Sequence, residues 1–345
     1  MISVTSARTQ VAAQSRLGRL AAQPAEAVAQ AGDSPGWQAL GAALGNWQEL
    51  DVPTRTTVVA LLAQLGFHRY VVQLVPRPSA ADSESEQLSY EVARAAHQYN
   101  RMSSAPMQIF SWLAEQAGSP VLRLLSALQF VSNQVREHRN TEEAAKWLAV
   151  SAELVERLKG PDWLVHLGRS RFHRAAGLFH TLTRDSAQAA AVMTAGLLAD
   201  DELALALPRT DTATGVDAFE AGLVVHYHRE NRRLVLEALL KLDTLAGTSH
   251  APKDAVGQLL ALDPYDPDPN FTIGSYLERQ GRVEEAAERY LDSAASGTVR
   301  GAHAACMAAD CYEKLGNTDG ATRARQLWRD LDPAAAVPPS VPLGS

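Results

Sequence analysis

Three histidines stand seven residues apart in one stretch of the chain, at His166, His173 and His180. On an α-helix this spacing would place all three along one side. A serine and three arginines accompany them, namely Arg169, Ser170, Arg171 and Arg174. If that helix lined a groove, these groups could bind an acidic peptide or a phosphate. The simpler alternative is a polar helix face that binds no ligand.

A metal site fits these histidines poorly, because seven residues span about 10.5 Å along a helix axis, whereas neighbouring ligands on one helix stand three or four residues apart. The cysteines do not supply a better set. His303 and Cys306 could share a metal, but Cys311 would lie on another side of the same predicted helix. The two cysteines are also badly spaced for a disulfide within one helix. The sequence therefore predicts no metal site.

A second basic stretch runs from His226 to Arg233. His226 and Glu230 stand one helical turn apart, and so do Arg229 and Arg233. Acid–base catalysis would need a partner group and a pocket, which the sequence does not show. The simpler interpretation is that these residues cap and solvate a helix junction. The alternative is that they recognise an anion together with the histidine stretch. The candidate residues for binding a peptide or partner are His166, Arg169, Ser170, His173, Arg174, His180, His226, Arg229 and Arg233.

No other motif indicates catalysis or a cofactor. The sequence has no phosphate-binding loop, no dinucleotide-binding glycine pattern and no metalloprotease histidine pair. A nucleophile, a base and an orienting group cannot be assembled from the spacings. We therefore predict no catalytic residues and no cofactor, and the sequence favours a protein that is not an enzyme.

Nearly all the segments that must position these residues read as helices. Acidic or hydroxyl groups mark several first turns, as at 51–54 and 140–143. The stretch 162–183 could form one rod of about six turns. Only 67–75, which is rich in valine, is a candidate strand. Before the last two hairpins, helices are predicted to begin near Val11, Trp37, Thr54, Glu84, Pro106, Pro120, Thr141, Asp162, Ser186, Gly215, Arg233 and Ala255.

Three glycines in the C-terminal third recur at a nearly fixed period. Gly247, Gly281 and Gly316 are 34 and 35 residues apart, and each stands between two helix-like stretches. A period of this length is typical of stacked helical hairpins, in which each hairpin buries its apolar face against the next. The spacing therefore predicts a helical array over the last 100 residues or so.

The residues around these glycines resemble the tetratricopeptide repeat. In the unit 266–290, Gly274 takes the small position of the first helix, and Ala286 and Tyr290 take the small and aromatic positions of the second. The next unit fits at Tyr312 and Ala321, although Arg325 stands where an aromatic residue is usual. The unit around Gly247 departs further, with Leu240 at the small position and Pro252 where alanine is expected. The resemblance, which covers the C-terminal third only, implies a groove that binds a peptide or a protein.

We predict an all-α fold built as a helical-hairpin array, a solenoid similar to the tetratricopeptide proteins, with irregular N-terminal and middle parts. Four regions are expected: an N-terminal helical part (1–76), irregular hairpins (84–232), repeat-like hairpins (233–335) and a disordered tail (336–345). Residues 1–24 contain three arginines and no acid, as transit segments do, but a first amphipathic helix is the simpler interpretation.

Composition limits the function classes. The net charge of −7 argues against nonspecific binding to nucleic acid or to anionic membranes, and no apolar run approaches the length needed to span a bilayer. The two cysteines and the scarcity of lysine, with five among 32 basic residues, favour a cytoplasmic protein of a bacterium with a GC-rich genome.

The function predicted from these features is that of an adaptor or scaffold that holds a protein or peptide segment on the concave surface of its helices, and an acidic segment is one candidate. The first alternative is an accessory or catalytic subunit of an assembly that modifies peptides. The second is a repeat-containing transcriptional regulator, which rests on a faint helix-turn-helix pattern around Gly66. Neither the partner nor the oligomeric state follows from the sequence.

Overall fold

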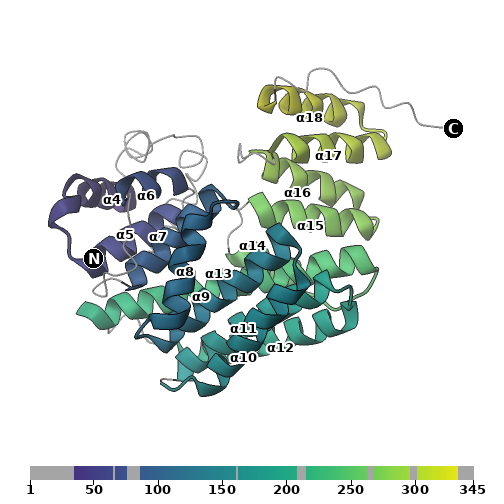
Figure 1. Ribbon diagram of the computed structural model, residues 1–345. Coiled ribbons are helices and arrows are strands. Elements are labelled where there is room, and N and C mark those ends of the chain that lie inside the picture. Colours follow the sequence, from purple (N-terminus) through teal and green to yellow (C-terminus); the bar gives the residue numbers. More distant parts are fainter. Residues whose placement is uncertain are drawn as a thin grey trace. The chain divides into compact units, whose positions relative to one another are not determined.

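The computed structural model describes residues 35–64, 67–75, 86–160, 162–207, 215–262, 267–295 and 301–332. These residues form α-helices joined by short turns, and no strand occurs among them (Figure 1). The prediction of an all-α fold is thus confirmed over the described part of the chain. The predicted helix near Val11, the basic stretch 1–24 and the tail 336–345 lie outside the described residues, and so does Gly66 itself, whereas 61–64 and 67–72 on either side of it are described.

The chain divides into two compact units, one ending at Leu242 and one beginning at Asp243. The interval between 76 and 84, where we expected a boundary, falls inside the first unit. The predicted boundary at 232–233 lies ten residues before the observed division. Helix α13 (Gly215–Ala246) explains this difference, because it runs without a break through the predicted helix start at Arg233, which is therefore wrong. No glycine or proline between 226 and 240 would interrupt it.

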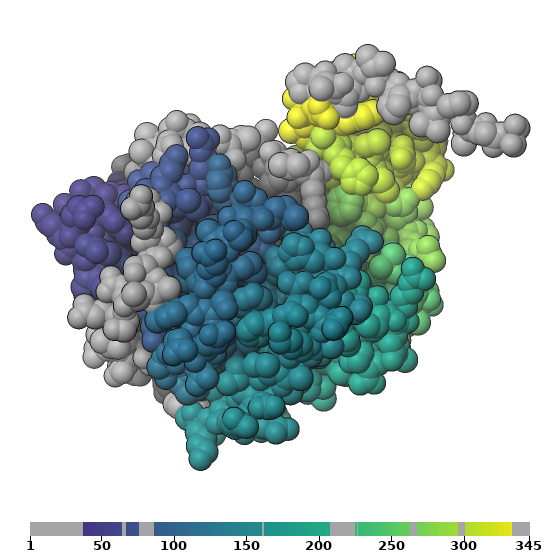
Figure 2. All heavy atoms as spheres, viewed as in Figure 1, coloured from purple at the N-terminus to yellow at the C-terminus, as the bar shows by residue number. Residues whose placement is uncertain are grey.

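The first unit is a succession of helices that pack mainly on their neighbours in sequence. In the space-filling view, the helices from α7 to α11 form one closely packed face of this unit, coloured blue to teal (Figure 2). A short 3-10 turn, η1 (Trp47–Glu49), and a π-helical segment, η3 (Gln134–His138), interrupt the series. Its remaining helices, apart from α13, are α4 (Pro35–Gly45), α5 (Val52–Gln64), α6 (His68–Leu74), α7 (Glu86–Tyr99), α8 (Ser104–Gln116), α9 (Pro120–Asn133), α10 (Thr141–Arg157), α11 (Asp162–Leu182) and α12 (Ser186–Ala206).

The candidate strand at 67–75 is instead a helix, α6. The Val71 N–H donates to the Phe67 carbonyl and the Val75 N–H to the Val71 carbonyl, both at 3.0 Å. A strand would need a neighbouring strand for its backbone groups, whereas a helix satisfies them internally. This helix also places Val71 in the core, where it is fully buried.

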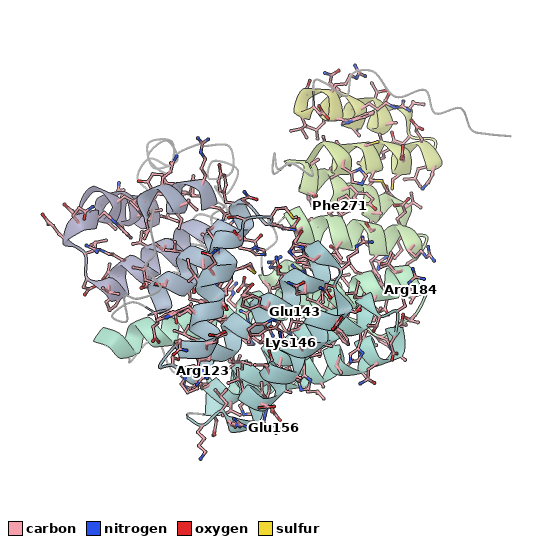
Figure 3. The ribbon with its side chains drawn as sticks, in the orientation of Figure 1. Arg123, Glu143, Lys146, Glu156, Arg184 and Phe271 are labelled. Carbon is pink, nitrogen blue, oxygen red and sulfur yellow. The ribbon has the colours of Figure 1, made fainter. Side chains whose placement is uncertain are left out.

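Side-chain caps fix several helix starts where the sequence predicted them. The carboxylate of Asp51 accepts the Thr54 N–H at 2.8 Å, and the amide oxygen of Asn140 accepts the Glu143 N–H at 3.1 Å. The Glu143 carboxylate, labelled in Figure 3, accepts the indole N–H of Trp147 at 2.9 Å and so holds the first turn of α10. Helix α11 covers 21 residues, as the predicted rod requires.

Helices α11 and α12 approach closely because small residues lie between them. A Cβ at Gly177 would lie 2.4 Å from Cγ of Met193, and a Cβ at Gly196 would lie 3.2 Å from Cβ of His173. The two helices are joined by a tight turn in which Arg184, labelled in Figure 3, adopts a left-handed conformation with φ 62°. This close packing brings polar side chains of both helices into one interior layer.

The second unit contains α14 (Ala255–Leu262), α15 (Pro267–Arg279), α16 (Val283–Ala295), α17 (Gly301–Lys314) and α18 (Thr318–Leu331). Consecutive helices pack together, and α15 also contacts α17. The period glycines terminate helices in left-handed conformations, with φ 67° at Gly247, 77° at Gly281 and 69° at Gly316. Arg325, which stands where an aromatic residue was expected, forms an ion pair with Glu313. The unit is therefore a stack of helical hairpins with the predicted period.

Candidate functional site

The predicted histidine stripe lies along α11, and two of its members face α12. Nδ1 of His166 lies 2.9 Å from a carboxylate oxygen of Glu202, and His173 packs on Gly196. The ring of His180 contacts Phe179 edge-on, with the ring centres 5.5 Å apart. All three histidines are half-buried, while Arg169 is exposed. The stripe is thus partly covered by the protein itself.

Ser170 belongs to a sealed hydrogen-bond group. Its hydroxyl lies 3.0 Å from the Gly196 carbonyl, and the amide nitrogen of Asn231 donates both to this hydroxyl and, at 3.1 Å, to Asp200. Ser170, Asp200 and Asn231 are fully buried. Ser170 therefore ties α11, α12 and α13 together and offers no surface to a partner.

His228 adds the third residue type of a catalytic triad, but the connections are wrong for one. Its Nε2 lies 3.3 Å from the carboxylate of Asp200, which is also the acceptor near Ser170. In a triad the histidine stands between the serine and the acid, so that it can take the serine proton. Here the acid lies between the other two, and the serine is sealed. Nucleophilic catalysis by this group does not follow.

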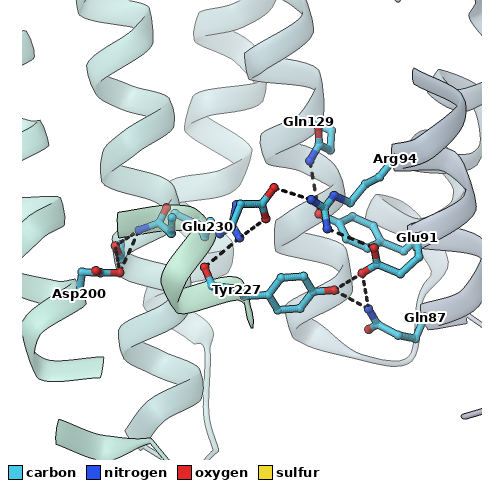
Figure 4. Close-up of polar contacts among 11 residues, drawn as sticks. Gln87, Glu91, Arg94, Gln129, Asp200, Tyr227 and Glu230 are labelled. Carbon is cyan, nitrogen blue, oxygen red and sulfur yellow. Dashed lines mark hydrogen bonds and ion pairs between the residues drawn. The ribbon is translucent and has the colours of Figure 1, made fainter. Parts of the chain in front are cut away.

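A second buried polar layer joins α7, α11 and α13 (Figure 4). The carboxylate of Glu230 receives Arg94 at 2.6 Å and Arg171 at 2.9 Å. Glu91 receives Arg94 at 3.1 Å and the hydroxyl of Tyr227. The guanidiniums of Arg94 and Arg171 lie 5.8 and 5.5 Å from the centre of the Tyr227 ring. Two acids and two arginines thus form a joined network around one tyrosine.

The pKa shifts in this network favour a charged Arg94 and a neutral Tyr227. Burial lowers the pKa of Arg94, but Glu230 and Glu91 outweigh burial, so that its pKa is raised well above the usual value. Burial raises the pKa of the Tyr227 hydroxyl, and Glu91 raises it further. These residues connect α7, α11 and α13, and their charges are paired within the protein.

Arg174 differs from Arg171, although only one helical turn separates them. It is 9% exposed, its Nε is sealed from solvent without an acceptor, and within the described residues no acid pairs with it. Burial lowers its pKa to about 9, and the nearby guanidiniums of Arg136 and Arg171 contribute to the same shift. Glu230 opposes this shift, but it forms no ion pair with Arg174 within the described residues. The protein therefore holds Arg174 largely buried without an ion pair.

Arg136 extends this positive region to the surface. It lies in the π-helical segment η3, is exposed, and has no acid partner in the part of the chain that the structure describes. Its pKa is also lowered, chiefly by desolvation from the protein atoms near the guanidinium, although the residue keeps contact with solvent, and next by Arg101, against the opposing effects of Glu237 and Glu137. We define the arginine cluster as Arg174 and Arg136 together with the arginines whose charges act on them, namely Arg101, Arg171 and Arg233.

Burial and nearby arginines also lower the pKa values of two histidines, His68 and His97. Burial lowers the pKa of His68 to about 4, with Arg94 and Arg101 contributing. The pKa of His97 is lowered by burial as well, and Arg101 and Arg136 lower it further against the opposing effect of Glu137. Both imidazoles are therefore neutral at pH 7, and neither adds to the charge of the cluster.

The structure brings only part of the candidate binding set to this place. Arg174 belongs to the cluster, and so does Arg233, whose guanidinium lies 2.6 Å from Glu237. Arg229 is half-buried on α13. The side chain of His226 lies outside the described residues. Sequence reasoning missed Arg101 and Arg136, and it named Arg171 beside the histidines without including it in the candidate set. The basic residues Arg136, His138 and Arg139 were a signal for Arg136, but nothing local linked them to α11.

The donor set suits an anion. Guanidinium groups present several N–H donors and no acceptor, so that they bind carboxylates or phosphates and repel metal ions. Over the described ranges, no group of three or more His, Cys, Asp or Glu residues could hold a metal ion. Likewise, none of the helices described here is both long and apolar enough to cross a membrane.

A comparison with models of known protein families finds no match for this chain, and a comparison with curated protein sequences finds none either.

Proposed function

We propose that this protein is a binding adaptor, in which stacked helical hairpins hold a segment of another protein or a peptide and the arginine cluster receives an acidic group of that segment. The observation that carries the proposal is the buried, unpaired guanidinium of Arg174. A cytoplasmic location fits the two free cysteines, Cys306 and Cys311, since thiols stay reduced there.

A buried arginine without a counter-charge is unfavourable for the folded protein. Arginine gives up its proton only with great difficulty, so the charge remains and must be solvated or paired. Groups with strongly perturbed pKa values cluster at functional sites. An acidic ligand at Arg174 would restore the pairing that Glu230 already gives to Arg171.

The fold supports binding over catalysis. Stacked hairpins expose successive helices as an extended surface, which suits an extended peptide. The first unit, in which the arginine cluster lies, also consists of helices that pack on their neighbours in sequence, and the sequence of the second unit resembles the tetratricopeptide repeat. A catalytic role in a peptide-modifying assembly would need an accessible nucleophile or acid–base pair, whereas Ser170, Asp200 and His228 are joined in the wrong order.

Binding of acidic peptides by the full chain tests the proposal. Peptides rich in Asp and Glu are compared with the same peptides carrying Asn and Gln, and affinities are measured by fluorescence anisotropy. We expect the acidic set to bind, and we expect Arg174→Met to weaken binding by more than tenfold, since a charge-assisted hydrogen bond contributes about 1.5–3 kcal/mol.

Arg169→Met is the matched control. The sequence placed Arg169 in the candidate binding set, but the structure leaves it exposed on the same helix and outside the arginine cluster, so we no longer assign it to the site. It should leave the affinity within about twofold of the parent, an effect of at most about 0.4 kcal/mol. Equal losses in the two variants would show that the general charge of α11 is responsible. Absence of any preference for acidic peptides would overturn the proposal.

A further inference from the structure

We infer that the arginine cluster binds a phosphate monoester in its doubly charged form, carried on a phosphorylated side chain of a protein or peptide. This assignment rests on the proposed function and specifies the ligand of the same site. It follows from the charge that the site leaves unmatched, from its free donors and from the acids around it.

The charge balance of the cluster favours a doubly charged ligand. Three members of the cluster have acid partners: Arg171 pairs with Glu230 at 2.9 Å, Arg233 with Glu237 at 2.6 Å, and Arg101 with Glu137 at 3.5 Å. Arg136 and Arg174 form no ion pair in the described part of the chain, although Glu230 acts on Arg174 and Glu237 and Glu137 act on Arg136. Two guanidiniums of the cluster are thus left without an ion pair. A carboxylate would match one of them. A phosphate monoester carries a charge of about −1.5 to −2 at pH 7 and would match both.

The hydrogen-bond donors of the cluster also suit a phosphate. The Nε atoms of Arg171 and Arg174 are sealed from solvent and lack acceptors. A guanidinium offers a planar fork of N–H groups, which fits two oxygens of one phosphate. Arg174 is buried while Arg136 is exposed, so the pair extends from the interior to the surface. A phosphate entering from the surface would have its inner oxygens near the buried donors.

The acids around the cluster favour a single phosphate over a nucleic acid. A nucleic acid presents a row of phosphates and is bound by a row of exposed basic side chains. Here the positive region is bordered by Glu137, Glu230 and Glu237, which would repel adjacent phosphates. The whole chain also carries a net charge of −7. The arrangement thus favours one isolated phosphate on a polypeptide.

The test uses the full chain and three matched peptide libraries, in which the central residue is phosphoserine, glutamate or serine. Inorganic phosphate and a single-stranded oligonucleotide are measured alongside. We expect the phosphoserine peptides to bind at least about tenfold more tightly than the glutamate peptides, which is about 1.4 kcal/mol. Inorganic phosphate should compete for the same site with weaker affinity.

Two variants check that the site is the arginine cluster. Arg174→Met should abolish the preference for phosphoserine. Arg174→Lys keeps the charge but loses the planar fork, so it should retain binding while lowering the phosphoserine-to-glutamate ratio. Far-ultraviolet circular dichroism confirms that both variants are folded, and Arg169→Met again serves as the control.

The outcomes separate this inference from the proposed function. If phosphoserine and glutamate peptides bind equally and both depend on Arg174, the phosphate inference fails and the adaptor proposal stands. If no acidic peptide binds, both fail. If inorganic phosphate binds as tightly as any phosphopeptide, the ligand is a free phosphate compound and the polypeptide carrier is wrong. Binding of the oligonucleotide through Arg174 would likewise overturn the choice of a polypeptide.

Discussion

Arg171 and Arg174 show how one helical turn can change the role of a residue. Both are about nine-tenths buried on α11. Arg171 has Glu230 at 2.9 Å and the Tyr227 carbonyl at 3.2 Å, and its charge is satisfied within the fold. Arg174 has no acid partner within the described residues and lies near two other guanidiniums. We therefore expect Arg171 to stabilise the helix packing and Arg174 to lower the stability of the ligand-free protein.

The first prediction is that these arginines respond to the same substitution in opposite ways. Arg174→Met removes an unmatched buried charge and should raise the free energy of unfolding of the ligand-free protein by about 1–3 kcal/mol. Arg171→Met leaves Glu230 with one partner fewer and should lower it by about 3–5 kcal/mol. Urea unfolding followed by circular dichroism measures both values. A loss of stability in Arg174→Met would mean that the guanidinium has a favourable partner.

The second prediction concerns acid. The pKa of His68 falls from 6.5 to about 4 on folding, through burial and then through Arg94 and Arg101. Between these values the unfolded chain binds a proton at His68 that the folded protein does not bind, so stability must fall as the pH decreases. The loss should reach roughly 3 kcal/mol by pH 4.

His68→Phe should remove this part of the pH dependence, and His138→Phe, at an exposed histidine, is the matched control. Unfolding free energies are measured between pH 7 and pH 4 in both variants. The prediction is wrong if His68→Phe and His138→Phe lose stability with equal slope.

At the scale of elements, small residues set how closely the hairpins of the second unit pack. A Cβ at Gly274 on α15 would lie 2.8 Å from the ring of Tyr290 on α16. That ring cannot easily move, because its hydroxyl is bonded to Ser275 at 3.1 Å and to Glu278 at 3.0 Å. Gly257 on α14, in contrast, has nothing within 4 Å of the equivalent position.

The third prediction follows from this contrast. Gly274→Ala should lower the free energy of unfolding by about 1–3 kcal/mol, since the tyrosine must shift. Gly257→Ala should raise it by about 0.5–1 kcal/mol, since alanine loses less conformational freedom in a helix. Thermal unfolding of the two variants in parallel measures the difference. Equal effects would show that Gly274 does not set the α15–α16 distance.

Much of the helical framework could be predicted from local signals. Helices α9, α10, α11, α12, α13 and α14 begin where the sequence predicted, because caps, prolines and acids act on adjacent residues. The helix start at Arg233 was wrong because a charged stretch was taken for a junction, although Arg233 and Glu237 pair within one helix. The strand predicted at 67–75 was wrong, because valine content does not determine a strand when no partner strand is available.

The candidate site was predictable only in part. Arg174 and Arg233 stood out as basic residues on polar stretches. Their unequal pairing could not be foreseen, because it depends on contacts between residues far apart in sequence, such as Arg94 with Glu230 and Arg171 with Glu230. Ser170 looked like a surface residue for the same reason. Its burial results from the close approach of α11 to α12 at Gly196.

At the scale of the whole molecule, the two units have separate interiors. Every member of the arginine cluster lies before Leu242, in the first unit. The hairpins from Asp243 onward have their own packing, which includes Phe271 (Figure 3) and the tyrosine at 290, with ring centres 5.4 Å apart. Ligand binding and hairpin stability should therefore be separable.

The fourth prediction is that residues 243–332 fold alone. We expect this fragment to be helical and to unfold cooperatively on heating, because each hairpin packs on its neighbour within the unit. A saturating phosphopeptide ligand should raise the Tm of the full chain, since it binds only the folded state, and leave the Tm of the fragment unchanged. A fragment without a cooperative transition, or one stabilised by the ligand, would contradict the prediction.

Arg136 lies in the π-helical segment Gln134–His138, so its direction depends on the number of residues in that segment. A π turn holds one residue more than the α turn that it replaces, with bonds to the fifth residue instead of the fourth. Its end is marked by the Asn140 N–H, which donates to the Gln134 carbonyl at 3.0 Å. Loss of one residue here would let α9 continue as a regular α-helix and leave the residues after the segment nearly in register, because one turn is completed either way. Only the residues inside the segment, which include Arg136, would change their direction around the helix axis. A single codon deletion that retains every arginine would therefore test whether the extra residue sets the position of Arg136.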